Sequence, residues 1–188
     1  MLKKIHSLNI VLTVITAAVL CVFLFMPENL YCSDQAEQKI LEAGGQHLKK
    51  SLVHLYFADR KNEFLIAEDR AVLYSNGPEE LGGIIIRELI KGPEKELMQT
   101  IPAGVSLRAF YVTENKTAFV DLSKDVIKNH PGGIKSEILT IYSIVNTLIL
   151  NITEINAVKI IIDGHESLTL TGHIDLSLPF KANMLLIR

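Results

Sequence analysis

Five residues near the C-terminal end of the chain carry the side chains best suited to chemistry. They are Asp163, His165, Glu166, His173 and Asp175. Carboxylates and imidazoles are the usual protein ligands of divalent metals, and they also serve as general acids and bases. One interpretation of this group is therefore a metal or acid–base centre.

The spacing of these residues does not fit a local metal motif. The pair His165-Glu166 is not followed by a second histidine at the helical offset that a zinc-protease helix requires. Gly164 and Gly172 indicate turns, so we expect extended and turn structure here instead of a helix. The sequence therefore favours a structural use of the group.

The alternation around His173 supports the same interpretation. In an extended segment His173 and Asp175 lie on one face, while Ile174 and Leu176 point into the core. Asp175 can then accept a hydrogen bond from a neighbouring backbone amide or from Ser177, which fixes a turn. We accordingly predict no catalytic, cofactor-binding or metal-binding residue in the chain.

The triplet Asp121-Leu122-Ser123 repeats the pattern of Asp175-Leu176-Ser177. A functional interpretation is a pair of carboxylates for acid–base work, and a structural one is two turn caps at strand ends. We favour the turn caps. The chain also lacks the sequence patterns of a serine nucleophile, a phosphate-binding loop and a dinucleotide fold, so no cofactor is expected.

The composition excludes several classes of function. The chain has 188 residues, a formal net charge of −2 and no tryptophan. A near-neutral charge without a basic stripe or stacking aromatics argues against nucleic-acid binding. The absence of tryptophan also argues against an aromatic platform for cell-wall sugars. The length suits one domain with an appendage.

The N-terminal region predicts a membrane anchor. Residues 8–26 contain no charged side chain, and at 1.5 Å per residue they span roughly 28 Å, close to the thickness of a bilayer core. Lysines precede this run, whereas Glu28 and Asp34 follow it. The positive-inside rule then places residues 1–7 in the cytoplasm and the rest of the chain outside it, as in a single-pass protein with a periplasmic domain.

Two alternatives to an uncleaved anchor are open. A cleaved signal peptide usually has a shorter apolar region of about 7–15 residues and a small-x-small cleavage site, which is missing here. Lipid modification at Cys21 or Cys32 needs a small residue just before the cysteine, but Leu20 and Tyr31 stand there. Both features favour the anchor.

The remaining chain predicts a polar linker over residues 27–50 and one domain over residues 51–188. Strands are expected at 52–57 and 64–74, a hairpin at 106–113 and 117–122, and a buried central strand at 157–163. A helix should begin at Pro78 and end at Gly92-Pro93, and a longer one should cover 134–151. The last strands are expected at 168–170 and 176–186. This order indicates an α+β fold, a two-layer sandwich with two amphipathic helices on one face of a mixed β-sheet, preceded by the transmembrane helix.

Seven collinear fragments resemble the GerM-type sporulation and germination domain, GerMN. They are residues 53–59, 65–70, 88–93 (ELIKGP), 100–104 (TIPAG), 118–123 (AFVDLS), the long helix with Gly133, Glu137 and 144–148 (IVNTL), and Gly164 with 171–180 (TGHIDLSLPF). The resemblance covers nearly all of the predicted soluble domain, in a single copy.

The resemblance implies a non-catalytic, membrane-anchored interaction or assembly module of the bacterial cell envelope. Its expected partners are the membrane, through the N-terminal helix, and further copies of itself or other envelope proteins. The alternative is an envelope hydrolase or a cell-wall ligand-binding module that uses the region of His173 and Asp175.

Overall fold

The computed structural model describes residues 50–73 and 76–188. Its elements, in chain order, are β1 (Lys50–Ala58), β2 (Leu65–Leu73), α3 (Pro78–Lys91), β3 (Leu107–Val112), β4 (Thr117–Leu122), α4 (Asp125–Lys128), α5 (Ile134–Asn151), β5 (Ala157–Ile162) and the 3-10 helix η2 (Met184–Leu186). The predicted cytoplasmic residues 1–7, the span 8–26 and nearly all of the linker 27–50 lie outside the described residues. Among the described helices, none is long and apolar enough to cross a bilayer.

Strands β1 and β2 form an antiparallel hairpin in regular register, with Val53 opposite Arg70. The turn between them depends on Asp59, whose Oδ1 accepts hydrogen bonds from the backbone amides of Glu63 at 2.6 Å and Phe64 at 3.2 Å. Asn62 adopts a left-handed conformation with φ 56°, which asparagine tolerates better than most residues. The sequence prediction of both strands and of the polar turn is confirmed.

Helix α3 begins and ends where the sequence indicated. Pro78 occupies the first turn together with the acids Glu79 and Glu80, and Gly92 follows the last turn with φ 91°. The proline presets the helical φ, and the acids face the positive end of the helix dipole. Only a glycine takes up the conformation at position 92 without strain.

Helix α3 packs closely against β3 because residue 82 has no side chain. A Cβ atom at Gly82 would lie 2.2 Å from the ring of Phe110 on β3. The neighbouring Gly83 has far more room, since its Cβ would meet only the flexible end of Arg87 at 3.4 Å. Of the two adjacent glycines, only Gly82 is therefore required for the close approach of α3 to β3.

This difference predicts opposite effects for two alanine substitutions. Gly82→Ala displaces the Phe110 ring, and we expect a net loss of about 1–2 kcal/mol because overpacking exceeds the gain in helix propensity. Gly83→Ala should instead raise the free energy of unfolding by about 0.5–1 kcal/mol, since it only restricts the unfolded chain and the helix. Urea unfolding of both variants measures the difference. Equal effects at the two positions would contradict the close contact.

The second sheet has the order β3-β4-β5, with β3 antiparallel and β5 parallel to the central β4. The sheet is therefore mixed, as predicted. The expected central position of the strand at 157–163 is wrong, because β5 lies at an edge of this sheet. Its outer side is instead bonded by a loop, through reciprocal hydrogen bonds between Val158 and Phe180.

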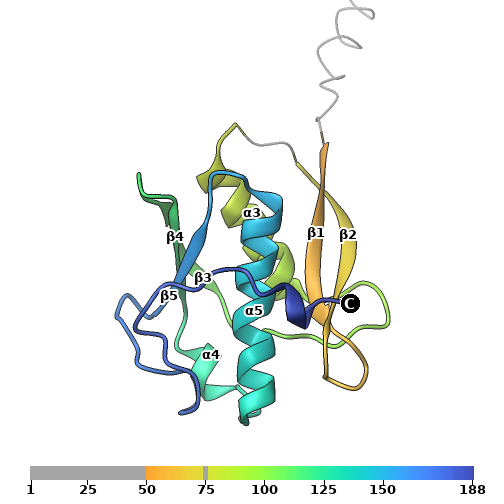
Figure 1. Ribbon diagram of the computed structural model, residues 1–188, viewed down its shortest axis with the longest axis vertical. Coiled ribbons are helices and arrows are strands. Elements are labelled where there is room, and N and C mark those ends of the chain that lie inside the picture. Colours follow the sequence, from red (N-terminus) through yellow and green to blue (C-terminus); the bar gives the residue numbers. More distant parts are fainter. Residues whose placement is uncertain (1–49, 74–75) are drawn as a thin grey trace, which may run out of the picture. The chain divides into compact units, whose positions relative to one another are not determined.

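Helix α5 lies between the two sheets, as Figure 1 shows, with α3 beside it. The predicted two-layer arrangement, with both helices on one face of one sheet, is wrong: the β1–β2 hairpin and the three-stranded sheet enclose the helices from opposite sides. Buried residues of α5 consequently surround it, and they include Thr140, Ser143, Asn146 and Thr147. Ile134, which was expected on the apolar stripe, is exposed.

The polar side chains of α5 bind the backbone of β1. The Asn151 side chain accepts from the amide of His54 at 2.8 Å and donates to its carbonyl at 2.7 Å. The Thr147 hydroxyl accepts from the amide of Tyr56 at 3.1 Å. The strand edge facing the helix is thus satisfied by side chains, which removes the cost of burying unpaired amides.

Residues 163–181, called the closing segment here, contain no helix and no named strand. The strands predicted at 168–170 and 176–186 are therefore wrong. Isolated bridges replace them, joining Ile162 to His165 and Val158 to Phe180, and the short helix η2 follows. Side chains, and not a sheet ladder, must hold this segment in place.

Candidate functional site

A single buried carboxylate holds the closing segment. Glu137, in the first turn of α5, is fully buried. Its Oε1 accepts from the amides of Leu170 at 3.0 Å, Thr171 at 3.1 Å and Ile174 at 3.4 Å. Its Oε2 accepts from the Thr171 hydroxyl at 2.7 Å and, in His173, from Nδ1 at 2.9 Å and the amide at 3.2 Å. The loop wraps the carboxylate on both oxygens.

These bonds keep Glu137 ionised. Burial by itself raises the pKa of a carboxyl group, because it disfavours the charge. The hydrogen bonds from Thr171, His173 and Ile174 outweigh burial and lower the pKa of Glu137 to about 2. A carboxyl group with such a pKa remains charged at neutral pH and is a poor proton donor.

The structure accounts for His173 and Asp175 by local bonds. Nδ1 of His173 faces a carboxylate oxygen of Glu137, so this nitrogen carries the hydrogen. Asp175 accepts from the amide of Ser177 at 2.8 Å, and this bond lowers the pKa of Asp175. The predicted turn bond is confirmed, and so is the alternation, since Leu176 is buried while His173 and Asp175 are exposed.

Asp163 and Asp121 are brought together by a shared arginine. Arg108 on β3 contacts Asp121 at 3.2 Å and Asp163 at 2.9 Å. Asp121 also accepts from the amide of Gly164 at 2.9 Å, which fixes the turn after β5. Asp121 thus serves as a turn anchor, as the structural interpretation of its triplet expected.

His165 and Glu166 complete the predicted group. Nδ1 of His165 lies 2.8 Å from the carbonyl of Asp163, and Glu166 lies 3.7 Å from the Nζ of Lys159. Within residues 50–73 and 76–188, no three histidine, cysteine, aspartate or glutamate side chains gather in a way that could hold a metal ion. The five candidates do not converge on one point: His165 contacts the backbone of Asp163, and the others make contacts of their own.

Lys159 was not among the residues predicted from the sequence. It lies in β5, is 3% exposed, and donates to the carbonyls of Leu176 at 2.9 Å and Ser177 at 2.6 Å. Glu137 therefore binds amides of the closing segment, and Lys159 binds its carbonyls. The signal was a lone lysine inside the apolar run of residues 158–162.

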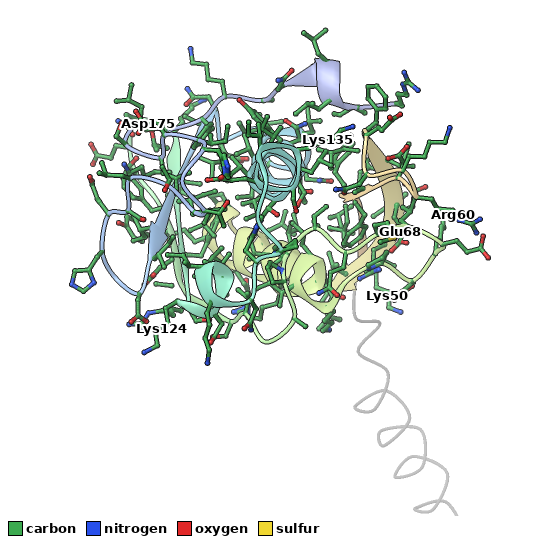
Figure 2. All side chains as sticks on the ribbon, turned by 90° about the horizontal axis from the view of Figure 1, so that it is seen from below. Lys50, Arg60, Glu68, Lys124, Lys135 and Asp175 are labelled. Atoms are coloured by element: carbon green, nitrogen blue, oxygen red, sulfur yellow. The ribbon has the colours of Figure 1, made fainter. Side chains whose placement is uncertain are left out.

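A second buried carboxylate, Glu68 on β2, holds the loop after α3. It accepts from the amides of Glu94 at 3.1 Å and Lys95 at 2.8 Å, and it pairs with the guanidinium of Arg70. Burial opposes ionisation, but these donors lower the pKa of Glu68 below its ordinary value. Figure 2 shows Glu68 and Asp175 on opposite sides of the domain. The use of buried charges to fix loops is thus found at two separate places.

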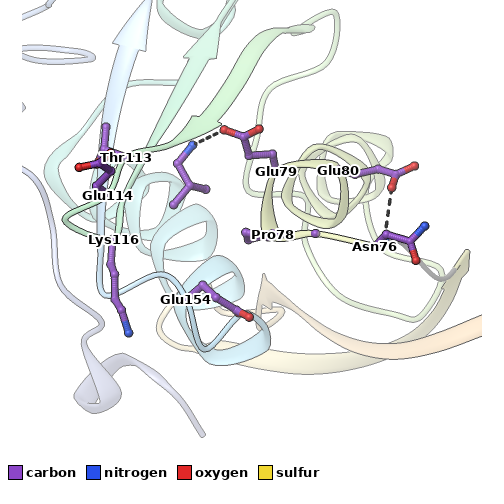
Figure 3. A pocket seen from close by; sticks show the side chains of 10 residues that line it. Asn76, Pro78, Glu79, Glu80, Thr113, Glu114, Lys116 and Glu154 are labelled. Atoms are coloured by element: carbon purple, nitrogen blue, oxygen red, sulfur yellow. Dashed lines mark hydrogen bonds between the residues drawn. The ribbon is translucent and has the colours of Figure 1, made fainter.

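A hollow of about 630 Å³ lies elsewhere, between the start of α3 and the β3–β4 turn (Figure 3). Its lining includes Glu79, Glu80, Glu114 and Glu154, together with Lys116. Glu79 is already bonded to the amide of Val112, and Glu80 to that of Asn76. None of the five predicted candidates lines this hollow.

A model of one protein family covers residues 54–168, and its description reads "Germane: Sporulation and spore germination". The chain belongs to the Germane family. The Germane match begins in β1 and ends within the closing segment, so the resemblance drawn from residues 171–180 lies beyond it. No curated protein matches the chain.

Solved structures share the fold of this Germane chain. A candidate lipoprotein from Clostridium perfringens is 29% identical, with a TM-score of 0.51, and the match covers 72% of this chain and 89% of the other. The first GerMN domain of the sporulation protein GerM from Bacillus subtilis is 21% identical, with a TM-score of 0.56, and the match covers 69% and 97%. The tandem GerMN domains of the same protein are 20% identical, with a TM-score of 0.53, over 70% and 46%.

Proposed function

We propose that this Germane protein is a non-catalytic, membrane-anchored module that assembles with other proteins or with further copies of itself outside the cytoplasmic membrane of a bacterium. One observation carries the proposal: the residues best suited to chemistry are engaged in structural bonds. His173 is bonded to the buried carboxylate of Glu137, and Asp175 to the amide of Ser177. These side chains stabilise a scaffold.

The predicted anchor over residues 8–26 supplies the location in this proposal. The candidate lipoprotein of Clostridium perfringens supports an envelope setting, because a lipoprotein is held at a membrane surface, and the family description links such domains to sporulation and germination. An anchored domain whose candidate catalytic side chains are engaged in structural bonds is suited to holding other proteins near the membrane.

A membrane-impermeant, amine-reactive crosslinker tests location and assembly together. The full chain is expressed with an affinity tag in a bacterial host, and spheroplasts are treated from outside. We expect tagged products larger than the monomer. A product seen only with a permeant crosslinker would place the domain on the wrong side, and a monomer with both reagents would refute assembly.

Replacing His173 with alanine separates this proposal from the hydrolase alternative. The carboxylate of Glu137 loses one side-chain donor, so we expect a loss of about 1–3 kcal/mol in stability. The crosslinked products should persist below the melting temperature. Asp175→Ala should likewise lower the melting temperature, through the loss of its turn bond. A variant of either residue that melts like the unchanged protein but loses a measurable envelope activity would favour the hydrolase.

A further inference from the structure

Three strand edges of the domain are covered in part by other segments of the chain. On β1, Asn151 and Thr147 bind the backbone of His54 and Tyr56, and Met98 exchanges two hydrogen bonds with Ala58. On β3, the amide of Val112 donates to Glu79 of α3. On β5, Phe180 and His165 bind the outward backbone groups. An unpaired edge would be a template for association, and on each of these three edges another part of the chain bonds at least one outward backbone group.

The outer edge of β2 is different. The backbone groups of Ala58 bond Met98 and so point away from β2, and those of its partner Leu65 point away from β1. Every second residue further along β2 has the same orientation, so the amides and carbonyls of Ala67, Asp69, Ala71 and Leu73 also point away from β1. The described part of the chain covers only the start of this edge, where Arg188 donates to the carbonyl of Leu65. No described residue bonds the outward backbone from Ala67 to Leu73. In Figure 1, β1 lies between α5 and β2, so the outer edge of β2 faces away from α5.

The surroundings of this edge fit a second copy of the chain. A groove of about 400 Å³ runs between β2 and α3, and its rim carries Arg87 and Lys91 as well as Glu88 and Glu94. Charges of both signs on one rim are self-complementary under a twofold axis, whereas an acidic or a basic peptide would meet repulsion from half of them. The β2 edge also has no bulge that would turn it away from pairing.

The charged side chains of β2 exclude three registers for such a pair. A twofold axis at Glu68, Asp69 or Arg70 would place that charged residue directly opposite its own copy, which destabilises a sheet. An axis at Ala71 avoids all three and leaves a small residue at the centre. Asp69 then faces Leu73 of the second copy, and Arg70 faces Val72.

We propose that two copies of the chain associate through antiparallel pairing of their β2 edges around Ala71, which joins the two hairpins into one four-stranded sheet. The inference rests on the proposed function and names the surface by which the module associates with itself. Each hydrogen-bonded pair contributes two backbone bonds across the axis.

A single introduced cysteine tests the register. In the full chain, Cys21 and Cys32 are replaced by serine and Ala71→Cys is added. Directly opposite residues of such a pair lie about 5.5 Å apart at Cα, within the range of a disulfide. Ala67→Cys is the matched control, because it is on the same edge but lies four residues from the axis. Membranes are treated with a mild oxidant, and disulfide-linked dimers are measured by non-reducing electrophoresis.

We expect at least about tenfold more linked dimer for Ala71→Cys than for Ala67→Cys, because only the first cysteine meets its copy. Equal amounts from both variants, or none from either, would overturn the pairing. The impermeant amine-reactive crosslinker, applied in parallel, separates failure of the edge pairing from failure of the proposed function. Larger crosslinked products without a disulfide at position 71 overturn the edge pairing and leave the assembly function standing. If the larger products are absent as well, both are overturned.

Discussion

Glu137→Gln is expected to lower the free energy of unfolding by about 2–4 kcal/mol. The NH2 group of the glutamine must face hydrogen-bond donors that meet a carboxylate oxygen in the unchanged protein. The buried site then keeps one acceptor oxygen in place of two. Domains of this kind are stable by only about 5–15 kcal/mol, so the loss is a large fraction. Urea unfolding at neutral pH measures it.

The matched control is Glu80→Gln in the first turn of α3. That carboxylate is exposed and accepts one hydrogen bond, from the amide of Asn76. Its loss should cost no more than the interaction with the helix dipole, about 0.3–1 kcal/mol. If the two variants lost the same stability, the effect of Glu137 would come from the helix end and not from the closing segment.

The same group predicts a pH dependence of stability. The folded pKa of Glu137, about 2, is lower than the ordinary value of 4.5. Stability from its ionisation is therefore fully present above pH 4.5 and is lost as the pH falls toward 2, to a total of about 3 kcal/mol. The difference between the unchanged protein and Glu137→Gln should shrink between pH 7 and pH 3. A constant difference would contradict the lowered pKa.

Arg70→Met is expected to lower stability by about 3–5 kcal/mol, since it leaves the buried carboxylate of Glu68 without its cation. The guanidinium of Arg70 also donates to the carbonyls of Glu88 and Gly92 at 3.2–3.3 Å, and it lies 5.9 Å from the ring centre of Phe57. The substitution therefore frees the end of α3 as well as the loop after it.

A double-mutant cycle with Glu68→Gln isolates the pair. We expect the double variant to lose about 1–3 kcal/mol less than the sum of the single losses, because each change removes the partner that the other leaves unpaired. Arg87→Met on the exposed face of α3 is the control and should change stability by less than about 0.5 kcal/mol. Simple additivity of the two changes would show that Glu68 and Arg70 act separately.

The order of the elements could be predicted from the sequence because local signals define it. Pro78 and Gly92-Pro93 bound α3, and the apolar, β-rich runs of β1 and β4 indicate strands. The division into two sheets could not be predicted, because it depends on α5 being buried on all sides. The signal was present in Thr140, Ser143, Thr147 and Asn151, which recur at helical spacing as a polar stripe that binds Thr100 and β1.

The candidate site was predicted in part. Local bonds such as Asp175 to Ser177 follow from short spacing and could be anticipated. The role of Glu137 could not be anticipated, because its partners lie 33–37 residues further along the chain. Its helical register with Ile141, Ile144 and Leu148 was the available signal, since an acid on a buried stripe must find donors.

The bonds between α5 and β1 also set an order of events in folding. The backbone of His54 is completed by Asn151, a separation of 97 residues, and the carbonyl of Leu65 is completed by Arg188. Contacts so distant in sequence must wait until loop closure brings the ends together, and domains rich in them fold slowly. The first hairpin to emerge during synthesis therefore remains without its covering partners until almost the whole domain has been made. A chain that is secreted as it is synthesised would then acquire its native structure only after translocation.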